Sequence, residues 1–280
     1  MNEIRTYNDY STEITETIRS NLTPKRMQEK LLSYHENDIA DALDLLTEEE
    51  RKKLYKILDS ESLADILEYS EHMADYIQEL SLSKKVEVFS HMETPDTVEA
   101  LRQLSREERE TLIDLLNPEV RSEIKLLSSF DEDEIGSKMS TNYITVEDHL
   151  SVKEAMSELV RQAADNDNIS TIYVVDNNRT FYGAIDLKDL IIAREGTSLR
   201  NIMTCSYPYV YARASIEDCI PQLMDYSEDS IPVLDNENKL IGAITAHDLV
   251  EVVEDELNED YAKLAGLSAE EDLEEPIRLS

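Results

Sequence analysis

Residue types that mark several common protein classes are scarce in this sequence of 280 residues. It contains no tryptophan and only two cysteines, Cys205 and Cys219, which do not form a C-x-x-C unit. Two separated cysteines build no disulfide framework, and no signal peptide precedes them, so we expect a reduced, cytosolic protein. The longest apolar runs, such as residues 190–193, are far shorter than the ~18 residues of a membrane span, which predicts a soluble chain.

Glycine is also rare, and none occurs before Gly136. A glycine-rich loop that cradles phosphates is therefore excluded from the first half, and with it the commonest kind of nucleotide site. The sequence has no G-x-S-x-G nucleophile motif, and its five histidines are scattered without partners at zinc-ligand spacing. We therefore expect no enzymatic activity.

Basic residues are few, because 27 Lys and Arg face 62 Asp and Glu, which leaves a formal net charge of −35. Such a surface repels phosphate backbones and anionic lipid headgroups, so nucleic acid is not an expected partner. The acidity has two interpretations: the carboxylates either keep the surface solvated or gather to bind cations. Composition alone favours the first interpretation.

Between residues 23 and 127, apolar residues recur at helical spacing behind acidic or hydroxyl residues. Thr47 and Glu50 have the spacing of a capping box, which predicts that a helix begins there. The pattern indicates eight or so short helices that stack as a superhelical domain at residues 23–130, after an N-terminal extension at residues 1–22. Similar helix starts occur at Ser60, Ser81 and Ser105, and Pro95 and Pro118 suit first-turn positions.

The hydrophobic period changes after a run of four acids and the first glycine, which together indicate a linker at residues 131–137. Beyond it, the order strand, helix, strand, strand, helix occurs twice. The same offset separates Asp176 from Asp235 and Gly183 from Gly242, which identifies an internal duplication. We expect strands near residues 143–146, 171–176, 180–185, 209–211, 231–235 and 240–244, and helices near 151–164, 188–190, 215–225 and from 247 onward.

The two copies share a start and an end. Each begins with methionine and a hydroxyl residue and ends near the pattern glycine, two apolar residues, threonine, two variable residues and aspartate. These marks resemble the CBS motif, and two copies in tandem resemble a CBS pair. In the first copy Asp186 replaces the usual threonine, which weakens the expectation of a nucleotide site there. The starts are Met139-Ser140 and Met203-Thr204, and the ends run from Gly183 to Asp189 and from Gly242 to Asp248.

A CBS pair occurs in many unrelated proteins, and the segments that flank it here point to one family among them. The leucine-rich acidic helices, the join from Asp131 to Met139 and the acidic tail from Val253 to Gly266 together resemble the MgtE family of magnesium transporters. The resemblance covers nearly the whole chain and implies an α + α/β fold, in which an all-helical superhelical N-terminal domain precedes a tandem CBS pair of β-α-β-β-α units. It implies a helical domain at residues 23–130, a linker at 131–137, CBS domains at 138–200 and 201–254, and the start of a connecting helix and tail at 255–280.

In this family the connecting helix leads to membrane helices, which this sequence lacks. The resemblance therefore implies a soluble fragment at the cytoplasmic face of the cell membrane. Its expected partners are the transmembrane domain of the same full-length transporter and a second copy of the chain, bound through the CBS pairs as a homodimer.

Residues 240–262 contain no Lys or Arg, although acids are frequent there. On a helix, the acids spaced by three and four residues between Asp248 and Glu259 form one stripe, and a hard cation would relieve their mutual repulsion. A solvated helix surface is the alternative interpretation. The resemblance favours cation binding and implies Mg²⁺ ligands at Asp248, Glu251, Glu256 and Glu259, with Asp65, Asp96 and Glu99 in the helical domain.

We expect a magnesium-sensing domain that gates a magnesium transporter or channel. Mg²⁺ would bridge acidic residues of the N-terminal domain, the CBS pair and the connecting helix and favour the closed state. One alternative is a CBS module that senses ATP or another adenine nucleotide through Thr245, Asp248 and Asp189. Another is a CBS-regulated, metal-dependent enzyme. Asp248 is therefore a candidate both as a metal ligand and as a contact to a ribose.

Overall fold

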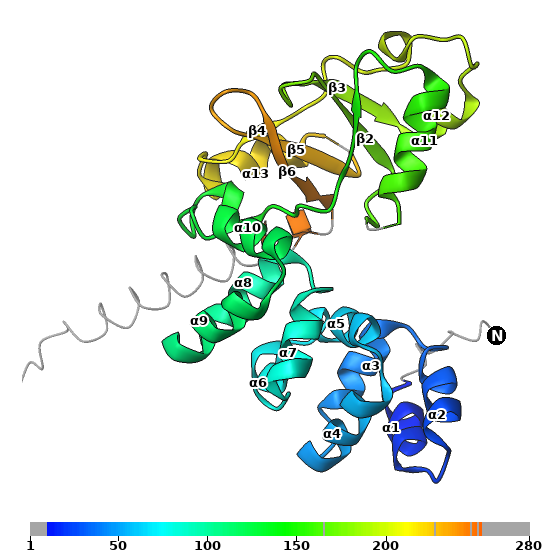
Figure 1. Ribbon diagram of the computed structural model, residues 1–280, viewed down its shortest axis with the longest axis vertical. Coiled ribbons are helices and arrows are strands. Elements are labelled where there is room, and N and C mark those ends of the chain that lie inside the picture. The colour runs from blue at the N-terminus through cyan, green and yellow to red at the C-terminus, as the bar shows by residue number, and fades with distance from the viewer. Residues whose placement is uncertain (1–9, 165, 227, 247, 251, 254–280) are drawn as a thin grey trace, which may run out of the picture. The chain divides into compact units, whose positions relative to one another are not determined.

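The computed structural model describes residues 10–164, 166–226, 228–246, 248–250 and 252–253. The chain divides into two compact units, Met1–Lys125 and Leu126–Ser280 (Figure 1). None of the described helices combines the length and the apolar character that a membrane span requires.

The first unit consists of short helices that stack on their second neighbours. Helix α1 contacts α3, α3 contacts α5, α5 contacts α7 and α7 contacts α9, while α2 packs on α4 and α6 on α8. This stacking is the superhelical arrangement that the helical spacing predicted. The helices are α1 (Ser11–Arg19), α2 (Pro24–Leu31), α3 (Glu36–Leu43), α4 (Glu48–Ile57), α5 (Ser60–Glu68), α6 (Met73–Gln78), α7 (Leu82–Phe89), α8 (Thr94–Gln103), α9 (Arg106–Leu115) and α10 (Pro118–Leu127).

The helix starts follow the predicted capping chemistry with one exception. Thr47 and Glu50 form a reciprocal capping box at the start of α4, as predicted. Ser81 and Ser105 also cap their helices by accepting a bond from a backbone N–H three residues on. Before α5 the cap is Asp59, whose carboxylate accepts from the Ser62 N–H at 2.9 Å, so the prediction of Ser60 was wrong by one residue.

A part-buried ion pair joins α4 to the end of α6. The guanidinium of Arg51 donates to the carboxylate of Glu79 and, at 2.7 Å, to the Leu46 carbonyl. It also lies 4.7 Å from the ring centre of Tyr76. The Tyr55 hydroxyl also donates to Glu79, at 2.9 Å. With their side chains only 15% and 14% exposed, Arg51 and Glu79 satisfy each other where water has little access.

The second unit contains two three-stranded sheets of the same topology (Figure 1). In each sheet the first strand pairs parallel with the second, and the second pairs antiparallel with the third. This confirms the predicted fold of a helical domain followed by two β-α-β-β-α repeats. The elements are η1 (Ile135–Lys138), β1 (Ile144–Glu147), α11 (Val152–Gln162), β2 (Thr171–Val175), β3 (Phe181–Asp186), α12 (Leu187–Ile192), η2 (Leu199–Asn201), β4 (Val210–Tyr211), α13 (Ile216–Met224), β5 (Ser230–Leu234) and β6 (Leu240–Thr245).

The hairpin turns show how closely the two repeats correspond. Arg179 and Asn238 occupy equivalent turn positions, and both have positive φ, at 66° and 62°. The aspartate that opens each turn, Asp176 or Asp235, accepts two backbone N–H bonds across it. The register shifts also fall at equivalent places, after Val174 and after Val233. The duplication seen in the sequence therefore extends to backbone geometry.

The first residues of each repeat pair with a strand of the other repeat. The backbone of Ser140 pairs with Ala243 in β6, and that of Thr204 pairs with Ala184 in β3. The preceding methionines pack on the glycines of the receiving strands, so that a Cβ at Gly242 would collide with Met139. These two glycines are required for close approach of the crossing strands.

Residues 131–137, predicted as a linker, pair with the second repeat. The N–H groups of Ile135 and Gly136 donate to the carbonyls of Ala214 and Ala212, both at 2.9 Å, and the Ile216 N–H donates to Asp133. Glu134 also accepts from the Arg213 guanidinium at 2.8 Å. The segment from Asp133 to Gly136 is thus a bonded part of the second unit.

Candidate functional site

Thr245 and Asp248 cap the helical segment that follows β6. The Thr245 N–H donates to Asp248 Oδ2 at 2.7 Å, and the Asp248 N–H donates back to Thr245 Oγ1 at 3.2 Å. This reciprocal pair is a capping box, in which threonine is the cap residue and aspartate takes the place of the usual glutamate. The spacing of the motif therefore has a local structural role, and it fixes both side chains at one end of the sheet.

In the first repeat, a different residue type caps the helix that follows the third strand. Asp186 caps α12 by accepting from the Lys188 N–H at 2.7 Å, which explains why aspartate can stand where the motif has threonine. Asp189 lies exposed in the first turn of α12. The candidate nucleotide residues Thr245 and Asp248 are thus brought together, whereas Asp189 belongs to the separate repeat.

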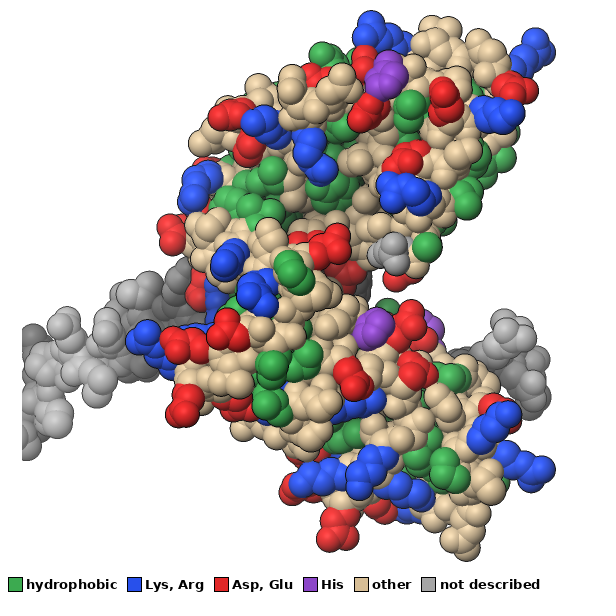
Figure 2. Space-filling model, viewed as in Figure 1, with side chains coloured by type: hydrophobic (Ala, Val, Ile, Leu, Met, Phe, Trp, Pro, Cys, Tyr) green, Lys and Arg blue, Asp and Glu red, His purple; other side chains and the backbone are tan. Residues whose placement is uncertain are grey.

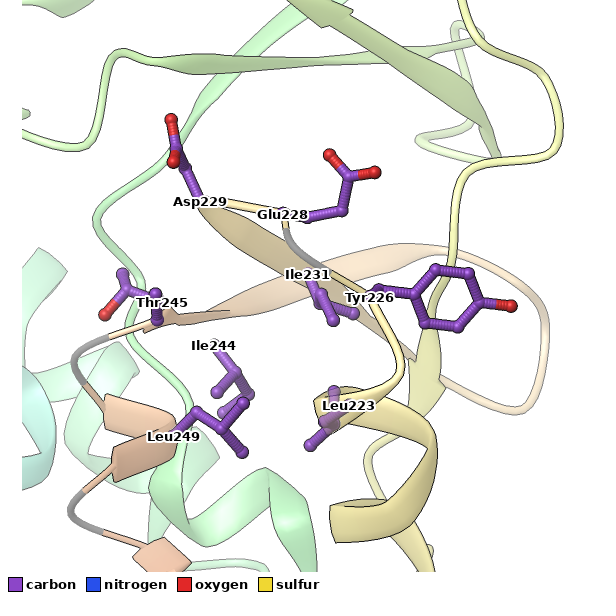
Figure 3. Close-up of a pocket in the computed structure, with 9 residues that line it drawn as sticks. Leu223, Tyr226, Glu228, Asp229, Ile231, Ile244, Thr245 and Leu249 are labelled. Carbon is purple, nitrogen blue, oxygen red and sulfur yellow. The ribbon is translucent and has the colours of Figure 1, made fainter.

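A cavity of about 260 Å³ opens on the second repeat beside Thr245 (Figure 3). Apolar side chains from α13, the two strands and the following helical segment line one part of it, and two acids just before β5 line another. In Figure 3 the carboxylates of Glu228 and Asp229 lie on the side away from Leu223 and Leu249. The lining residues are Leu223, Tyr226, Glu228, Asp229, Ile231, Ile244, Thr245, Ala246 and Leu249.

A buried tyrosine network lies next to these acids and joins the two repeats. The Tyr173 hydroxyl shares a 2.6 Å hydrogen bond with Ser230 Oγ, and the Tyr207 hydroxyl donates to the Ser230 carbonyl at 2.8 Å. Burial raises the pKa of Tyr207, and the neighbouring carboxylates of Glu228 and Asp229 raise it further. Burial also raises the pKa of Tyr173, so both phenols stay neutral, and the Tyr207 hydroxyl acts as a hydrogen-bond donor.

In the first unit, the structure brings three acids together around Glu68. Its carboxylate accepts from the Glu93 N–H at 2.6 Å. Burial raises the pKa of Glu68 to about 8 against that hydrogen bond, and the nearby carboxylates of Asp96, Glu93 and Asp65 add to the increase. Two of the predicted metal residues, Asp65 and Asp96, thus lie beside a third acid, whereas Glu99 is exposed.

Sequence reasoning missed Glu68. The available signal was its spacing of three residues from Asp65 on α5, where Ile66 and Leu67 show that the helix is packed on both sides. Spacing alone does not reveal that Glu93 and Asp96, from the start of α8, face the same place.

Three predicted magnesium ligands, Glu251, Glu256 and Glu259, lie outside the described residues, as does the predicted connecting helix. Within the described part of the chain, no three His, Cys, Asp or Glu side chains converge in a way that would hold a metal ion. Acidic and basic side chains are both spread over the face seen in Figure 2.

Family models match both parts of the chain. The model of the MgtE intracellular N domain matches residues 34–133, and the CBS domain model matches residues 133–196 and 199–255. The magnesium transporter MgtE of Thermus thermophilus is 30% identical over 87% of this chain and 55% of that protein. The magnesium transporter MgtE of Enterococcus faecalis is 29% identical over 99% of this chain and 62% of that protein. The chain therefore spans between half and two thirds of the length of these curated relatives.

Solved structures resemble both units. The crystal structure of the soluble part of a magnesium transporter matches with a TM-score of 0.82 and 28% identity, over 89% of this chain and 98% of that one. The crystal structure of the cytosolic domain of the Mg²⁺ channel MgtE in complex with ATP matches with a TM-score of 0.78 and 29% identity, over 86% of this chain and 99% of that one. The resemblance identified from the sequence motifs is thereby confirmed.

Proposed function

The chain carries the intracellular N domain and the CBS pair of the MgtE family of magnesium transporters, and we propose that it is the magnesium-sensing part that gates such a transporter. The observation that carries this proposal is the likeness of both units, in one chain, to the soluble part of a magnesium transporter. The relatives that match most of the chain are magnesium transporters and the cytosolic domain of one, so we also propose that the chain has no catalytic activity of its own.

The proposed magnesium ligands are carboxylates, the oxygen donors that this hard cation prefers. The high pKa of Glu68 supports the part of the proposal that concerns the first unit. Burial and neighbouring carboxylates destabilise a negative charge there, and a bound cation would offset that charge. The full set of proposed ligands is Asp65, Asp96 and Glu99 in the first unit, and Asp248, Glu251, Glu256 and Glu259 at the end of the second.

In the proposed mechanism, Mg²⁺ neutralises these carboxylates and bridges acidic parts of the chain, which favours the closed transporter. Without the ion, repulsion within a chain of net charge −35 favours separation. A shift from 1:99 to 99:1 needs roughly 5.5 kcal/mol of differential binding, and about four ions that each prefer the closed state tenfold would supply it. Because residues 133–136 are bonded to the second repeat, we place the pivot of this motion before Asp133.

The test is X-ray scattering of the 280-residue chain across a magnesium titration, with NaCl matched for ionic strength as the reference. We expect the radius of gyration to fall with magnesium and to change much less with sodium. The triple variant Asp248→Asn, Glu251→Gln and Glu259→Gln removes charge but keeps shape, so it should stay compact without magnesium.

The matched control carries Glu107→Gln, Asp114→Asn and Glu119→Gln, three exposed acids of the first unit outside the proposed sites. This control has the same net charge as the triple variant and should expand like wild type when magnesium is removed. An unchanged wild-type radius across the titration, or equal behaviour of the two triple variants, would refute the electrostatic gate.

A second proposed ligand is an adenine nucleoside or nucleotide at the CBS pair. It is supported by the cavity beside Thr245 and by the relative that was crystallised with ATP. Thr245, Asp248 and, in the first repeat, Asp189 are the proposed contacts. Because the capping box already engages Asp248, the ligand would meet a preformed site there.

We propose that the chain acts as a homodimer at the cytoplasmic face of a membrane, attached to the transmembrane domain of the full-length transporter. Support for the dimer comes from apolar side chains on the helices of both repeats, which are more than half exposed. Light scattering should give twice the monomer mass at micromolar concentration. The exposed apolar residues are Val160, Ile191, Ile192 and Met224.

A further inference from the structure

The side chain of Arg213 reaches over the segment that follows α10. Arg213 lies in the loop between β4 and α13, and its Nη1 donates to both carboxylate oxygens of Glu134, at 2.8 and 3.1 Å. Its Nη2 donates to the Ser129 carbonyl in a longer bond of 3.4 Å, and the guanidinium lies 5.2 Å from the ring centre of Phe130. One side chain thus contacts a segment that precedes it by 79 to 84 residues.

The segment is folded around these contacts. The Asp131 N–H donates to Glu134 Oε2 at 2.9 Å, and the Glu134 N–H donates to the Asp131 carbonyl at 3.0 Å, which closes a turn. The Phe130 ring is 8% exposed and packs on Gly136, where a Cβ would lie 2.9 Å from the ring. The turn and the ring thereby place Glu134 and Phe130 where one guanidinium reaches both.

These contacts extend the fixed part of the chain toward the first unit. Backbone bonding to the second repeat includes Asp133 and continues to Gly136. Arg213 carries the attachment from Asp133 back to Ser129, close to the end of α10 at Leu127. The acidic stretch that the sequence predicted as part of a linker is therefore held at both of its ends.

We infer that Arg213 is a latch that keeps residues 129–132 from acting as a hinge. The inference rests on the proposed magnesium gate, and it gives Arg213 the role of a positioning residue for that gate. While Arg213 holds, the pivot lies before Ser129. Without Arg213, residues 129–132 gain backbone freedom when the two units separate, and this entropy favours the separated state.

The effect on the gate follows from this entropy. Releasing the backbone of a single residue changes an equilibrium by about tenfold. When about four ions close the gate together, a tenfold change in the ratio of open to closed states shifts the magnesium midpoint by its fourth root, which is roughly twofold. Loss of Arg213 should therefore raise the magnesium concentration needed for closure without preventing closure.

The direct test is hydrogen–deuterium exchange of the full chain in EDTA, read by mass spectrometry on peptides that cover residues 129–134. We expect Arg213→Ala to speed exchange there at least about tenfold, because the N–H groups of Asp131 and Glu134 lose their ordered turn. Arg213→Lys keeps the charge but loses the fork that reaches two acceptors, so its exchange should fall between that of Arg213→Ala and wild type. The lysine variant also reports on the latch if the alanine variant is poorly folded.

The functional test is the magnesium titration followed by X-ray scattering. Arg213→Ala should move the midpoint of compaction roughly twofold toward higher magnesium and reach the wild-type radius at saturation. Arg200→Ala is the matched control, because Arg200 forms an ion pair with Asp148 at 2.7 Å in the same unit and its side chain is 69% exposed. This control removes the same charge and should leave both the exchange of residues 129–134 and the midpoint unchanged.

Unchanged exchange in Arg213→Ala, or a midpoint that Arg200→Ala shifts equally, overturns this inference and leaves the gate itself intact. A wild-type radius that does not respond to magnesium refutes the gate and, with it, the control of its midpoint by Arg213. The exchange experiment in EDTA then still decides whether Arg213 holds the segment.

Discussion

Replacing Glu68 with glutamine should stabilise the protein at alkaline pH, although it removes a buried hydrogen-bonding carboxyl. Its ordinary pKa is 4.5, and burial raises it to about 8 in the folded chain. The unfolded chain therefore releases this proton near pH 4.5, whereas the folded chain keeps it until about pH 8. Since the folded state then binds more protons, the free energy of unfolding falls as the pH rises through this interval.

The size of the effect follows from the shift. Each pH unit above 4.5 costs about 1.4 kcal/mol, which gives roughly 4 kcal/mol at pH 7.5 as an upper limit. The Glu68 side chain is partly exposed, so solvent screens part of this cost, and we expect about 2 kcal/mol. The amide of Glu68→Gln has no charge to bury, and its oxygen can still accept from the Glu93 N–H.

The assay is differential scanning calorimetry of the full chain in EDTA at pH 5 and pH 8. We expect Glu68→Gln to raise the melting temperature of the transition that involves the first unit by about 4–8 °C at pH 8 and to leave it nearly unchanged at pH 5. Glu71→Gln, an exposed neighbour, controls for the general relief of negative charge. A variant that melts below wild type at pH 8, or gains equally at both pH values, would refute the buried-acid account.

Two further predictions concern packing. Arg51→Met should lower the stability of the first unit by about 3 kcal/mol in chemical denaturation, because it leaves the Glu79 carboxylate buried without its cation. Lys52→Met, which breaks only an exposed pair with Glu48, should cost less than about 1 kcal/mol, and equal losses would contradict this reasoning. Gly242→Ala should cost about 1–3 kcal/mol, because the new methyl group meets Met139. Gly196→Ala, where a Cβ meets open space, is its control. Met139 is buried, so Met139→Ala has its own cost, and the clash is confirmed if Gly242→Ala costs less in a Met139→Ala background than in wild type, in thermal melts monitored by circular dichroism.

The sequence by itself determined the features that depend on neighbours along the chain. Helix α4 begins where Thr47 and Glu50 predict, because a capping box is made by residues three apart. The two repeats were recognisable from Asp176, Gly183 and their counterparts, because each hairpin needs an aspartate to bond the turn and a glycine to admit a crossing strand. The family resemblance rested on local motifs of this kind, and the matching family models and solved structures confirmed it.

Other features were decided only by the tertiary structure. The spacing of Glu68 from Asp65 shows only that the two acids share one helix, and tertiary packing brings Glu93 and Asp96 of the α8 start near Glu68 and buries it, which raises its pKa. The exchange of Met139 and Met203 between repeats and the bonding of residues 133–136 to the second repeat also join residues far apart in sequence. Hydrogen bonds, burial and charge repulsion depend on distance in space, and sequence patterns report that distance only within one helix or one turn.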